Sequence, residues 1–430
     1  MLTYEQALKR ILAATPAPRI AVVRLRESLG LVLARPMIAR CDLPQFDNSA
    51  VDGYALRSQD APRATNGPTT CQRPNGPPTL SGRHRRPGRW WDGHAARAAL
   101  HVVGRAEAGR PFGALVRQGE AVRILTGAQV PLGADAVAMQ EHVMQQRRQL
   151  VVQRWPPPGQ NIRRRGEDLR QGTRVLKAGT RLRAQEIGLL AALGVAKVPV
   201  YPRPTVATLT TGDELQLPGK RLGAGQIYES NGPLLQALVQ QAGAQAMDLG
   251  MGRDTLASLT RKVRRGLACD LLVLSGGVSV GDRDLVRNAL ARCGVRPLLW
   301  RVNIKPGMPL FIGRYRRTLV FGLPGNPVSV FVTFEEFVKP ALYRLMGRTW
   351  QDPYTEPAVL TENLRVSRTR RTHFIRVRCS QHNRLVAEPL DGQGSHQLRS
   401  LVEADGWIRV ASNDGPWSAG TPVLVKRGSA

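Results

Sequence analysis

Apolar and polar positions along the 430-residue chain follow different periods in different regions, and each period predicts a different kind of element. Four apolar residues of segment 3–14 recur at helical spacing after Thr3, which predicts an amphipathic helix with Thr3 as its N-cap. A second helical pattern covers residues 184–193. The proline-rich stretches 156–159 and 199–204 lie on either side of it, and we interpret both as linkers.

From Thr205 the pattern changes to buried strand, turn and helix in repeated alternation. This alternation predicts a mostly parallel sheet covered by helices, with ligands at the carboxyl ends of its strands. We expect Asp254 to cap one of the helices and Gly243 to end another. Strands are expected at 205–210, 270–274 and 319–323, and helices after Ser230, after Asp254, at 285–291 and at 328–346.

Two other regions show the shorter alternating runs of small β domains. They are residues 100–154, with glycine turns, and the chain after Pro353, with runs such as 373–378 and 407–411. Residues 61–100 differ from both, because they carry seven arginines, many prolines and glycines, and no period of 2 or 3.6. We interpret them as a disordered insertion or as a stretch read in the wrong frame, and assign them no function.

Length and composition limit the class of protein. The chain is long enough for roughly three domains, and its 42% apolar residues suffice for packed cores. The sequence contains no run of about 18 uncharged apolar residues, so we expect no membrane span. The N-terminal residues lack the features of a secretory signal. The five cysteines have no Cys-x-x-Cys spacing, which argues against a zinc site and a disulfide framework. We therefore expect a cytoplasmic protein without a membrane partner.

The formal net charge of +30 raises the question of nucleic-acid binding. The positive residues are mostly arginines spread along the whole chain. No run interleaves them with aromatic residues, which make up only 5% of the chain. A GC-rich genome would also replace lysine by arginine without any partner being involved. We expect small anionic ligands and no nucleic acid.

Candidate chemistry gathers at the turns that follow three expected strands. The turns 211–214, 276–284 and 322–327 should converge, since the carboxyl ends of parallel strands lie at one edge of a sheet. Carboxylates about 4 Å apart repel by roughly 4 kcal/mol at an effective dielectric of 20, so clustering them favours a cation such as Mg²⁺ beside a phosphate. The alternative is that each acid caps its own helix or is solvated. The four acids are Asp213, Glu214, Asp282 and Asp284.

Two further segments are rich in polar and turn-forming residues. Lys305 precedes the rigid turn of Pro306 and Gly307, where it can meet an anion, although a lone lysine before a turn usually faces solvent. The loop 42–55 has neither a helical nor a strand period. It is either a tight structural corner or a binding loop, and composition does not separate the two.

Five motifs occur together and in a fixed order. They are the loop 42–55 with its Asp-Gly-Tyr-Ala ending, Thr-Thr-Gly-Asp-Glu-Leu at 210–215, the glycine turn 275–284, Ile-Lys-Pro-Gly at 304–307, and Leu-Pro-Gly-Asn-Pro-Val-Ser at 323–329. Together they resemble the molybdopterin molybdotransferase family, which inserts molybdate during molybdenum cofactor biosynthesis and is similar to the E domain of gephyrin. The resemblance covers essentially the whole chain except residues 61–100.

The resemblance implies a multidomain fold of the α/β plus β class, in four parts, and an elongated homodimer with a shared active site. The expected parts are a discontinuous N-terminal α+β dimerisation domain of residues 1–45 and 155–203, an inserted small β domain of residues 46–154, a three-layer α/β molybdopterin-binding domain of residues 204–350 with a central parallel sheet, and a C-terminal β-barrel-like domain of residues 354–430.

The resemblance also implies a reaction. The substrates would be adenylylated molybdopterin and molybdate. Cleavage of the phosphoanhydride in the presence of Mg²⁺ would release AMP and leave molybdenum on the dithiolene sulfurs. The molybdopterin adenylyltransferase is a candidate partner.

Family positions carry over to individual residues of this chain. The catalytic matches are Asp52, Thr126, Asp168, Glu214, Asp254, Asp284 and Lys305, of which Glu214, Asp254 and Asp284 are expected to hold Mg²⁺. The residues expected around the pterin and its phosphate are Thr211, Gly212, Asp213, Ser275, Gly276, Gly277, Ser279, Gly281, Asp282, Pro306, Gly307, Pro324, Gly325, Asn326 and Pro327. Those expected near molybdate, besides Lys305, are Arg301, Arg371, Arg376 and Ser400. Arg301 stands where the family often has a lysine, which keeps the charge but changes its geometry.

The sequence also allows two functions other than molybdate insertion. One is a molybdopterin adenylyltransferase-like or nucleotide-processing enzyme on the same sheet, and the other is a gephyrin-like scaffold. The loop 47–55 and the C-terminal β domain argue against the first. The acidic cluster, together with the lack of a further fused domain, argues against the second.

Overall fold

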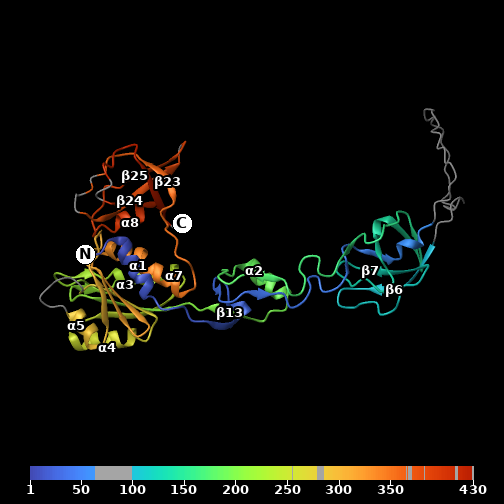
Figure 1. The fold of residues 1–430 in the computed structure, drawn as a ribbon, viewed down its shortest axis with the longest axis horizontal. Coiled ribbons are helices and arrows are strands. Elements are labelled where there is room, and N and C mark those ends of the chain that lie inside the picture. Colours follow the sequence, from blue (N-terminus) through green and yellow to red (C-terminus); the bar gives the residue numbers. More distant parts are fainter. Residues whose placement is uncertain are drawn as a thin grey trace. The chain divides into compact units, whose positions relative to one another are not determined.

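The computed structural model describes residues 1–62, 99–253, 255–277, 285–364, 366, 370–381, 383–411 and 415–428. Contacts within the chain divide it into two compact units (Figure 1). Unit one contains residues 1–36, 177–191 and 195–430, and unit two contains residues 37–176 and 192–194. Most of the segment 61–100 lies outside the described residues. None of the described helices is long and apolar enough to cross a membrane.

Unit two is built on a six-stranded sheet, which confirms the β prediction for residues 100–154. The strand order is β8-β5-β7-β6-β10-β9, with β6 and β7 parallel. A Cβ atom on Gly53 would overlap the carbonyl of Ala138, so only glycine fits where the chain enters the sheet after Asp52. The strands are β5 (Gly53–Leu56), β6 (Ala99–Ala106), β7 (Glu120–Ile124), β8 (Ala136–Met139), β9 (Val143–Gln146) and β10 (Gln149–Val152).

The first helix of unit one, α1 (Tyr4–Ala14), begins as predicted. The side chain of its N-cap Thr3 accepts a hydrogen bond from Gln6 N, and the Gln6 side chain accepts one from Thr3 N. Unit one also contains a small sheet of β1 (Ala21–Arg24), β13 (Lys197–Tyr201) and β2 (Val32–Leu33), and the helix α2 (Ala184–Ala192).

The prediction of a linker at 199–204 is wrong in its first half, because β13 runs through it. Val198 and Val200 are fully buried, and the carbonyl of Pro199 accepts a hydrogen bond from Ala34 N. Burial of alternate valines therefore outweighs the tendency of proline to interrupt a sheet.

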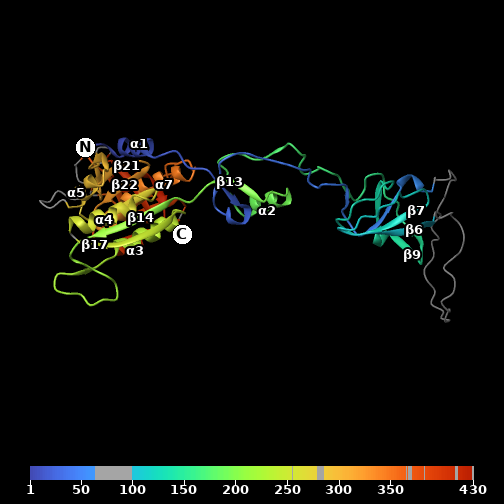
Figure 2. The same ribbon diagram turned by 90° about the horizontal axis from the view of Figure 1, so that it is seen from below.

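The α/β part of unit one contains the predicted parallel sheet, extended by two antiparallel strands. The order is β17-β14-β18-β22-β21-β19, with β17 at one edge beside β14 (Figure 2). Neighbouring strands among the first four are parallel, and β21 and β19 are antiparallel. The strands are β14 (Thr205–Thr211), β17 (Gln245–Gly252), β18 (Leu271–Ser275), β19 (Arg296–Trp300), β21 (Phe311–Tyr315) and β22 (Thr318–Leu323).

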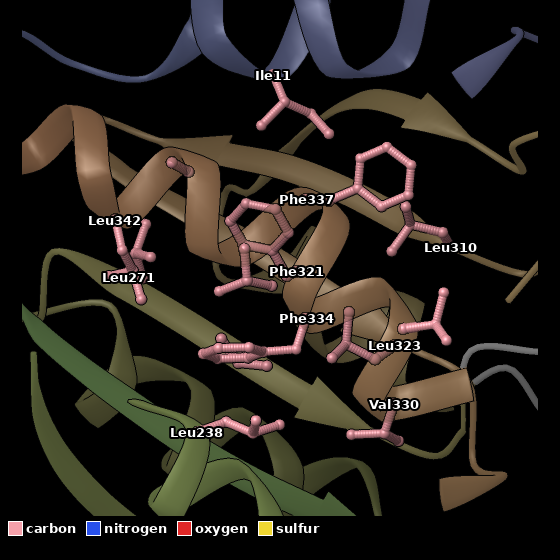
Figure 3. Packing of buried hydrophobic residues seen from close by; sticks show 14 of the residues in the cluster. Ile11, Leu238, Leu271, Leu310, Phe321, Leu323, Val330, Phe334, Phe337 and Leu342 are labelled. Carbon is pink, nitrogen blue, oxygen red and sulfur yellow. The ribbon is translucent and has the colours of Figure 1, made fainter. Parts of the chain in front are cut away.

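Helices cover both faces of this sheet (Figure 1). On one face, Ile11 of α1 packs with Phe321, Phe334 and Phe337 in the larger core (Figure 3). On the other face, α4 and α5 bury a second cluster that includes Leu259. The helices are α3 (Asn231–Gln241), α4 (Leu256–Gly266), α5 (Leu285–Arg292), α6 (Pro327–Thr333), a π-helical turn (Phe334–Val338) and α7 (Lys339–Leu345).

Two details of these helices correct the sequence interpretation. The N-cap of α4 is Thr255, whose hydroxyl accepts a hydrogen bond from Ser258 N at 3.3 Å, so the prediction of Asp254 as the cap is wrong. Thr255 has the extended backbone of a cap, with φ −123° and ψ 137°. The helix expected at 328–346 is interrupted by the π-helical turn at Phe334–Val338. Apolar periodicity does not reveal that interruption.

The C-terminal part of unit one is a six-stranded β sheet in which five strands close into a barrel. Its order is β20-β24-β25-β23-β27-β26, and an additional pairing of β24 with β26 completes the closure. The short strand β20 comes from the α/β part and pairs with the start of β24. The strands are β20 (Ile304–Lys305), β23 (Glu356–Leu360), β24 (Thr372–Gln381), β25 (Leu385–Pro389), β26 (Gly406–Ala411) and β27 (Pro422–Arg427), with α8 (Arg399–Glu403) before β26.

Candidate functional site

Three parallel strands of unit one end beside a pocket of about 740 Å³. Thr210 pairs with Ser275, and Ser275 pairs with Leu323, so β14, β18 and β22 end at the same level. The pocket is lined by Thr210, Thr211, Gly212, Glu214, Leu215, Ile227, Tyr228, Glu229, Ser230, Asn231, Ser275, Gly276, Gly277, Pro309, Pro324, Gly325, Asn326, Pro327, His396 and Leu398. Ten of the residues expected from the sequence are among them.

The other residues expected in this region are not among the described residues that line the pocket. Ser279, Gly281, Asp282 and Asp284 lie outside the described residues, as does Asp254. Asp213, Pro306 and Gly307 are described, but none of them lines the pocket. The turn that holds Pro306 reaches the pocket through Pro309.

Asn231, at the start of α3, links the strand ends that line the pocket. Its Nδ2 donates to Ser275 Oγ at 3.0 Å and to the carbonyl of Gly325 at 2.7 Å, so one side chain joins the ends of two strands to a helix. Asn231 Oδ1 and Thr211 Oγ1 are buried without a hydrogen-bond partner among the described residues. Because an unpaired buried polar atom is costly, these two atoms are candidates for ligand contacts.

Glycines bring the backbone close together at the pocket. Gly276 and Gly277 have φ of +90° and +66°, in the left-handed region that favours glycine. A Cβ on Gly276 would overlap the carbonyl of Thr211. At Gly212 a Cβ would lie 2.6 Å from the Glu214 carboxylate, so the Glu214 side chain folds back over this glycine.

Glu229 is a pocket residue that sequence reasoning missed. Only 5% of it is exposed, and its carboxylate accepts a hydrogen bond from Gly232 N at 2.6 Å. Burial raises the pKa of Glu229. Since this carboxylate already occupies the N-terminus of α3, a phosphate has better access to the glycine turn after β18. For the segment that contains Asn231 the sequence predicted only the start of a helix, and Glu229 lies just before that segment.

The predicted magnesium site is only partly within the described residues. Glu214 lines the pocket, and its carboxylate oxygens are of the type that Mg²⁺ prefers. No group of three His, Cys, Asp or Glu side chains that could hold a metal occurs among the described residues. Two of the three expected ligands lie outside them, so the metal site stays a prediction.

Arg376, on β24, is fully buried and has no acidic partner in the described parts of the chain. Its Nη2 donates to the carbonyls of Gly392 and Gly394, at 2.6 and 3.3 Å. Its Nε and Nη1 have no partner among the described atoms. Burial lowers the pKa of Arg376 to about 10, and no neighbouring charge acts against this shift. A buried cation with two free donors is a strong candidate to bind an oxyanion.

The loop 390–398 connects Arg376 with the pocket. Gln393 accepts a hydrogen bond from Arg376 N at 3.1 Å and donates one to its carbonyl at 2.8 Å. Ser395 Oγ accepts one from Asn326 Nδ2 at 2.8 Å, and His396 and Leu398 line the pocket. This loop has no apolar period, and sequence reasoning missed it.

The remaining basic and polar candidates surround the same strand. Lys305 is exposed on β20, next to His373 of β24, and Arg371 lies just before that strand. Arg301 has a positive φ of 60° and is half-buried. Ser400 is 3% exposed, and its hydroxyl already donates to the carbonyl of Gln397 at 2.5 Å.

Three family models match consecutive parts of the chain. They are the MoeA N-terminal region (domain I and II) over residues 2–194, the probable molybdopterin binding domain over 207–344, and the MoeA C-terminal region (domain IV) over 357–427. The chain belongs to the MoeA family. The family resemblance inferred from the motifs is therefore confirmed.

Individual MoeA relatives match over nearly the whole chain. A molybdopterin molybdenumtransferase of Haemophilus influenzae is 33% identical, covering 99% of this chain and 98% of the relative. A molybdopterin molybdenumtransferase 2 of Mycobacterium tuberculosis is 36% identical, covering 95% of each chain. The solved molybdopterin biosynthesis MoeA protein from Pyrococcus horikosii matches with a TM-score of 0.79 at 29% identity, over 100% of both chains. The multidomain fold expected from the resemblance is that of MoeA.

Unit two of this MoeA chain contains the other predicted acids. Thr126 donates to Asp52 Oδ1 from both its backbone N and its Oγ1, each at 2.7 Å. The Thr126 backbone and side-chain hydrogen bonds lower the pKa of Asp52. Asp168 N donates to the carbonyl of Leu43 at 3.1 Å. Leu43 belongs to the loop 42–55, which the sequence identified as either a binding loop or a structural corner. Thr126 was predicted from the resemblance to the family. Because it lies 74 residues from Asp52 in the sequence, no local pattern signals their contact.

Proposed function

We propose that this MoeA protein is a molybdopterin molybdotransferase, which inserts molybdate into adenylylated molybdopterin and releases AMP. The observation that supports this most is the buried, partly unpaired Arg376, joined by the loop 390–398 to a pocket at three strand ends. The relatives named molybdopterin molybdenumtransferase match the full chain, including its N- and C-terminal regions. Those matches favour this function over a nucleotide-processing enzyme made of the α/β part alone, or over a scaffold.

Different residues would bind different parts of the substrates. The backbone of Gly276 and Gly277 would receive the pterin phosphate, while Asn231 Oδ1 and Thr211 Oγ1 would hydrogen-bond to polar groups of the substrate. Lys305, Arg371 and Arg376 would attract molybdate, a dianion. Their positive charge would hold it where the dithiolene sulfurs can reach it.

Magnesium belongs to this proposal as well. Glu214, with Asp254 and Asp284, would hold Mg²⁺, which would neutralise charge at the phosphoanhydride during its cleavage. Glu214 supports this assignment because it lines the pocket beside the glycine-rich backbone.

The assembly and location follow the same family pattern. We infer a cytoplasmic homodimer in which the Asp52 and Thr126 loops of one subunit complete the pocket of the other. The exposed but hydrogen-bonded Asp52 carboxylate is consistent with such a role. The four-domain division of the chain and a transfer contact with the adenylyltransferase remain part of this proposal.

The experiment is anaerobic reconstitution with adenylylated molybdopterin, molybdate and Mg²⁺, with AMP release and metal loading as the two readouts. E214A and D284A should abolish both, while circular dichroism shows intact folding. E27A, which removes an exposed glutamate on the short helix Leu25–Glu27, is the matched control and should retain full activity. Full metal loading by E214A and by D284A would disprove the proposed acid roles.

A further inference from the structure

One side of the pocket carries apolar side chains of the kind that proteins usually bury. Ile227 and Tyr228, which form the short strand β16 (Ile227–Tyr228), are 56% and 49% exposed, and both line the pocket of about 740 Å³. Among the described residues, Tyr228 and Phe46 are the most exposed aromatic side chains, and only Tyr228 lines this pocket. Exposed apolar surface at the edge of a pocket is typical of a ligand-binding site.

Backbone hydrogen bonds hold these side chains beside the strand ends. β16 pairs in parallel with β15 (Leu215–Gln216), and Ile227 N donates to the carbonyl of Glu214 at 2.9 Å. Leu215 is the neighbour of Ile227 in this pairing, and it also lines the pocket. We call Leu215, Ile227 and Tyr228 the apolar wall.

Asn231, three residues after Tyr228, adds a hydrogen-bond acceptor to the same stretch of the pocket lining. The carbonyl of Gly325 can only accept a hydrogen bond, so the Asn231 atom 2.7 Å from it is the amide nitrogen, and Oδ1 is the atom left over. Oδ1 is buried, and it has no hydrogen-bond partner among the described residues. An N–H or O–H group of a ligand would satisfy it.

The apolar wall and the free acceptor together indicate the chemistry of the ligand. Phosphate groups have acceptor oxygens and no apolar face, so they suit the backbone of the glycine turn at Gly276 and Gly277 rather than Asn231 Oδ1. A planar heterocycle with an amino group suits both features, because its faces stack on apolar side chains and its edge donates hydrogen bonds. Molybdate has no such ring, whereas adenylylated molybdopterin has two, the pterin and the adenine.

We propose that the apolar wall and Asn231 form the subsite for a heterocyclic ring of the substrate. The ring packs on Ile227 and Tyr228 and donates an N–H hydrogen bond to Asn231 Oδ1. This inference rests on the proposed function and adds residues that determine specificity. Because Asn231 Nδ2 is bonded to Ser275 Oγ, next to Gly276, the ring subsite adjoins the glycine turn that would receive a phosphate. Adenine and the pterin share this chemistry, and the experiment distinguishes them.

The first measurement compares ligands and needs no variant. Calorimetry with the full-length protein gives the affinities of AMP, of AMP without its exocyclic amino group (purine riboside 5′-monophosphate) and of ribose 5-phosphate. If adenine occupies the subsite, AMP should bind about tenfold more tightly than the analogue, which leaves Asn231 Oδ1 unpaired. Ribose 5-phosphate lacks the ring altogether, so it should bind about a hundredfold more weakly than AMP.

The second measurement removes the apolar side chains. I227S/Y228S should weaken binding of the ring that occupies the subsite by about tenfold and leave ribose 5-phosphate binding unchanged. AMP and molybdopterin are tested separately, so a loss for AMP identifies adenine and a loss for molybdopterin identifies the pterin. Both side chains are exposed, and the variant should therefore fold normally. The control L217S/L222S changes two exposed leucines of the same segment that do not line the pocket, and it should bind both ligands like the wild type.

The hydrogen bond to Asn231 has its own test for each ring. If the wall variant identifies adenine, equal affinity of AMP and its analogue would disprove this hydrogen bond. If it identifies the pterin, N231D and N231L provide the comparison, since both lose the Nδ2 donor and only N231D keeps an acceptor. N231D should then bind molybdopterin about tenfold more tightly than N231L, and equal affinities would disprove the hydrogen bond.

Failure of the subsite and failure of the proposed function give different results. Wild-type binding of AMP and molybdopterin that I227S/Y228S leaves unchanged would overturn the subsite and leave the proposed function standing. An equal loss of ribose 5-phosphate binding would also overturn it, because the wall would then affect the pocket as a whole rather than a ring. If the wild type binds neither AMP nor molybdopterin, the proposed function fails and this inference fails with it.

Discussion

Two sets of buried polar side chains in unit one differ in how completely they are hydrogen-bonded. The first surrounds the π-helical turn, where Glu336 accepts hydrogen bonds from Tyr4, Tyr354 and Lys426 at 2.9, 3.0 and 2.9 Å. Beside it, Glu335 pairs with Lys426 at 3.0 Å and with Lys339 at 2.8 Å. We call these six residues the glutamate network.

The second set is Arg376, His373, Thr211 and Asn231, which we call the unpartnered set. Each of the four has at least one buried nitrogen or oxygen without a partner among the described atoms. In the glutamate network the charges satisfy one another, so the network joins α1, the π-helical turn and β27 without any ligand. Complete pairing is typical of a structural role, whereas an unpaired buried polar atom is a candidate for a ligand contact where it lies at a pocket, as those of Thr211 and Asn231 do.

The largest expected effect comes from breaking the glutamate network. K426M removes a buried cation and leaves two buried carboxylates with too little compensation. Although burial lowers it, the pKa of Lys426 is raised overall by Glu336 and Glu335. We expect the free energy of unfolding of unit one to fall by about 3–5 kcal/mol, measured by urea denaturation. The exposed-lysine control K220M should change it by less than about 0.5 kcal/mol. A loss below about 1 kcal/mol in K426M would show that the network is not structural.

Arg376 should give the opposite result. R376M removes two hydrogen bonds to carbonyls and the contact of the guanidinium with the Trp407 ring, 5.9 Å from its centroid, but it also removes a buried charge without an acidic partner among the described residues, so the unfolding free energy should change by less than about 1 kcal/mol. Metal insertion should fall by about 10²–10³-fold, since preorganised donors to an oxyanion commonly contribute that much. R378M, on the same strand but exposed, is the control and should keep full activity. If R376M lost stability instead of activity, the two sets would not differ in role.

The sequence predicted the elements better than it predicted the site. The strand expected at 270–274 is found at Leu271–Ser275, because a strand buried on both faces is a continuous apolar run. Tyr4 and Glu336 lie 332 residues apart, and no local pattern signals their contact. Asn231 was missed for the same reason, since its partners are 44 and 94 residues away. The expectations for Asp52 and Thr126 depended on resemblance to a family and not on the residues alone.

The smallest expected effect is on the pH dependence of the unfolding free energy, which should differ between the two sets. In the folded protein the pKa of His373 is about 4, below its ordinary 6.5, so protons bind the unfolded chain more tightly between these values. Stability should therefore fall as pH drops from 6.5 to 4, by on the order of 2 kcal/mol after solvent screening. For Glu335, burial raises the pKa, but Lys426 and Lys339 outweigh burial and lower it. Its contribution is thus present above its ordinary 4.5 and lost as pH falls further.

These two groups predict two acid steps in the unfolding free energy, with different sensitivities. The upper step should disappear in H373Q and shrink when molybdate is bound, because both remove the penalty of charging a buried imidazole beside Lys305. The lower step should persist in both cases, because the glutamate network has no ligand to gain. Urea denaturation at a series of pH values, with and without molybdate, measures both steps. If molybdate shifted the lower step as well, the glutamate network would be coupled to substrate, and the division into structural and substrate-binding polar groups would fail.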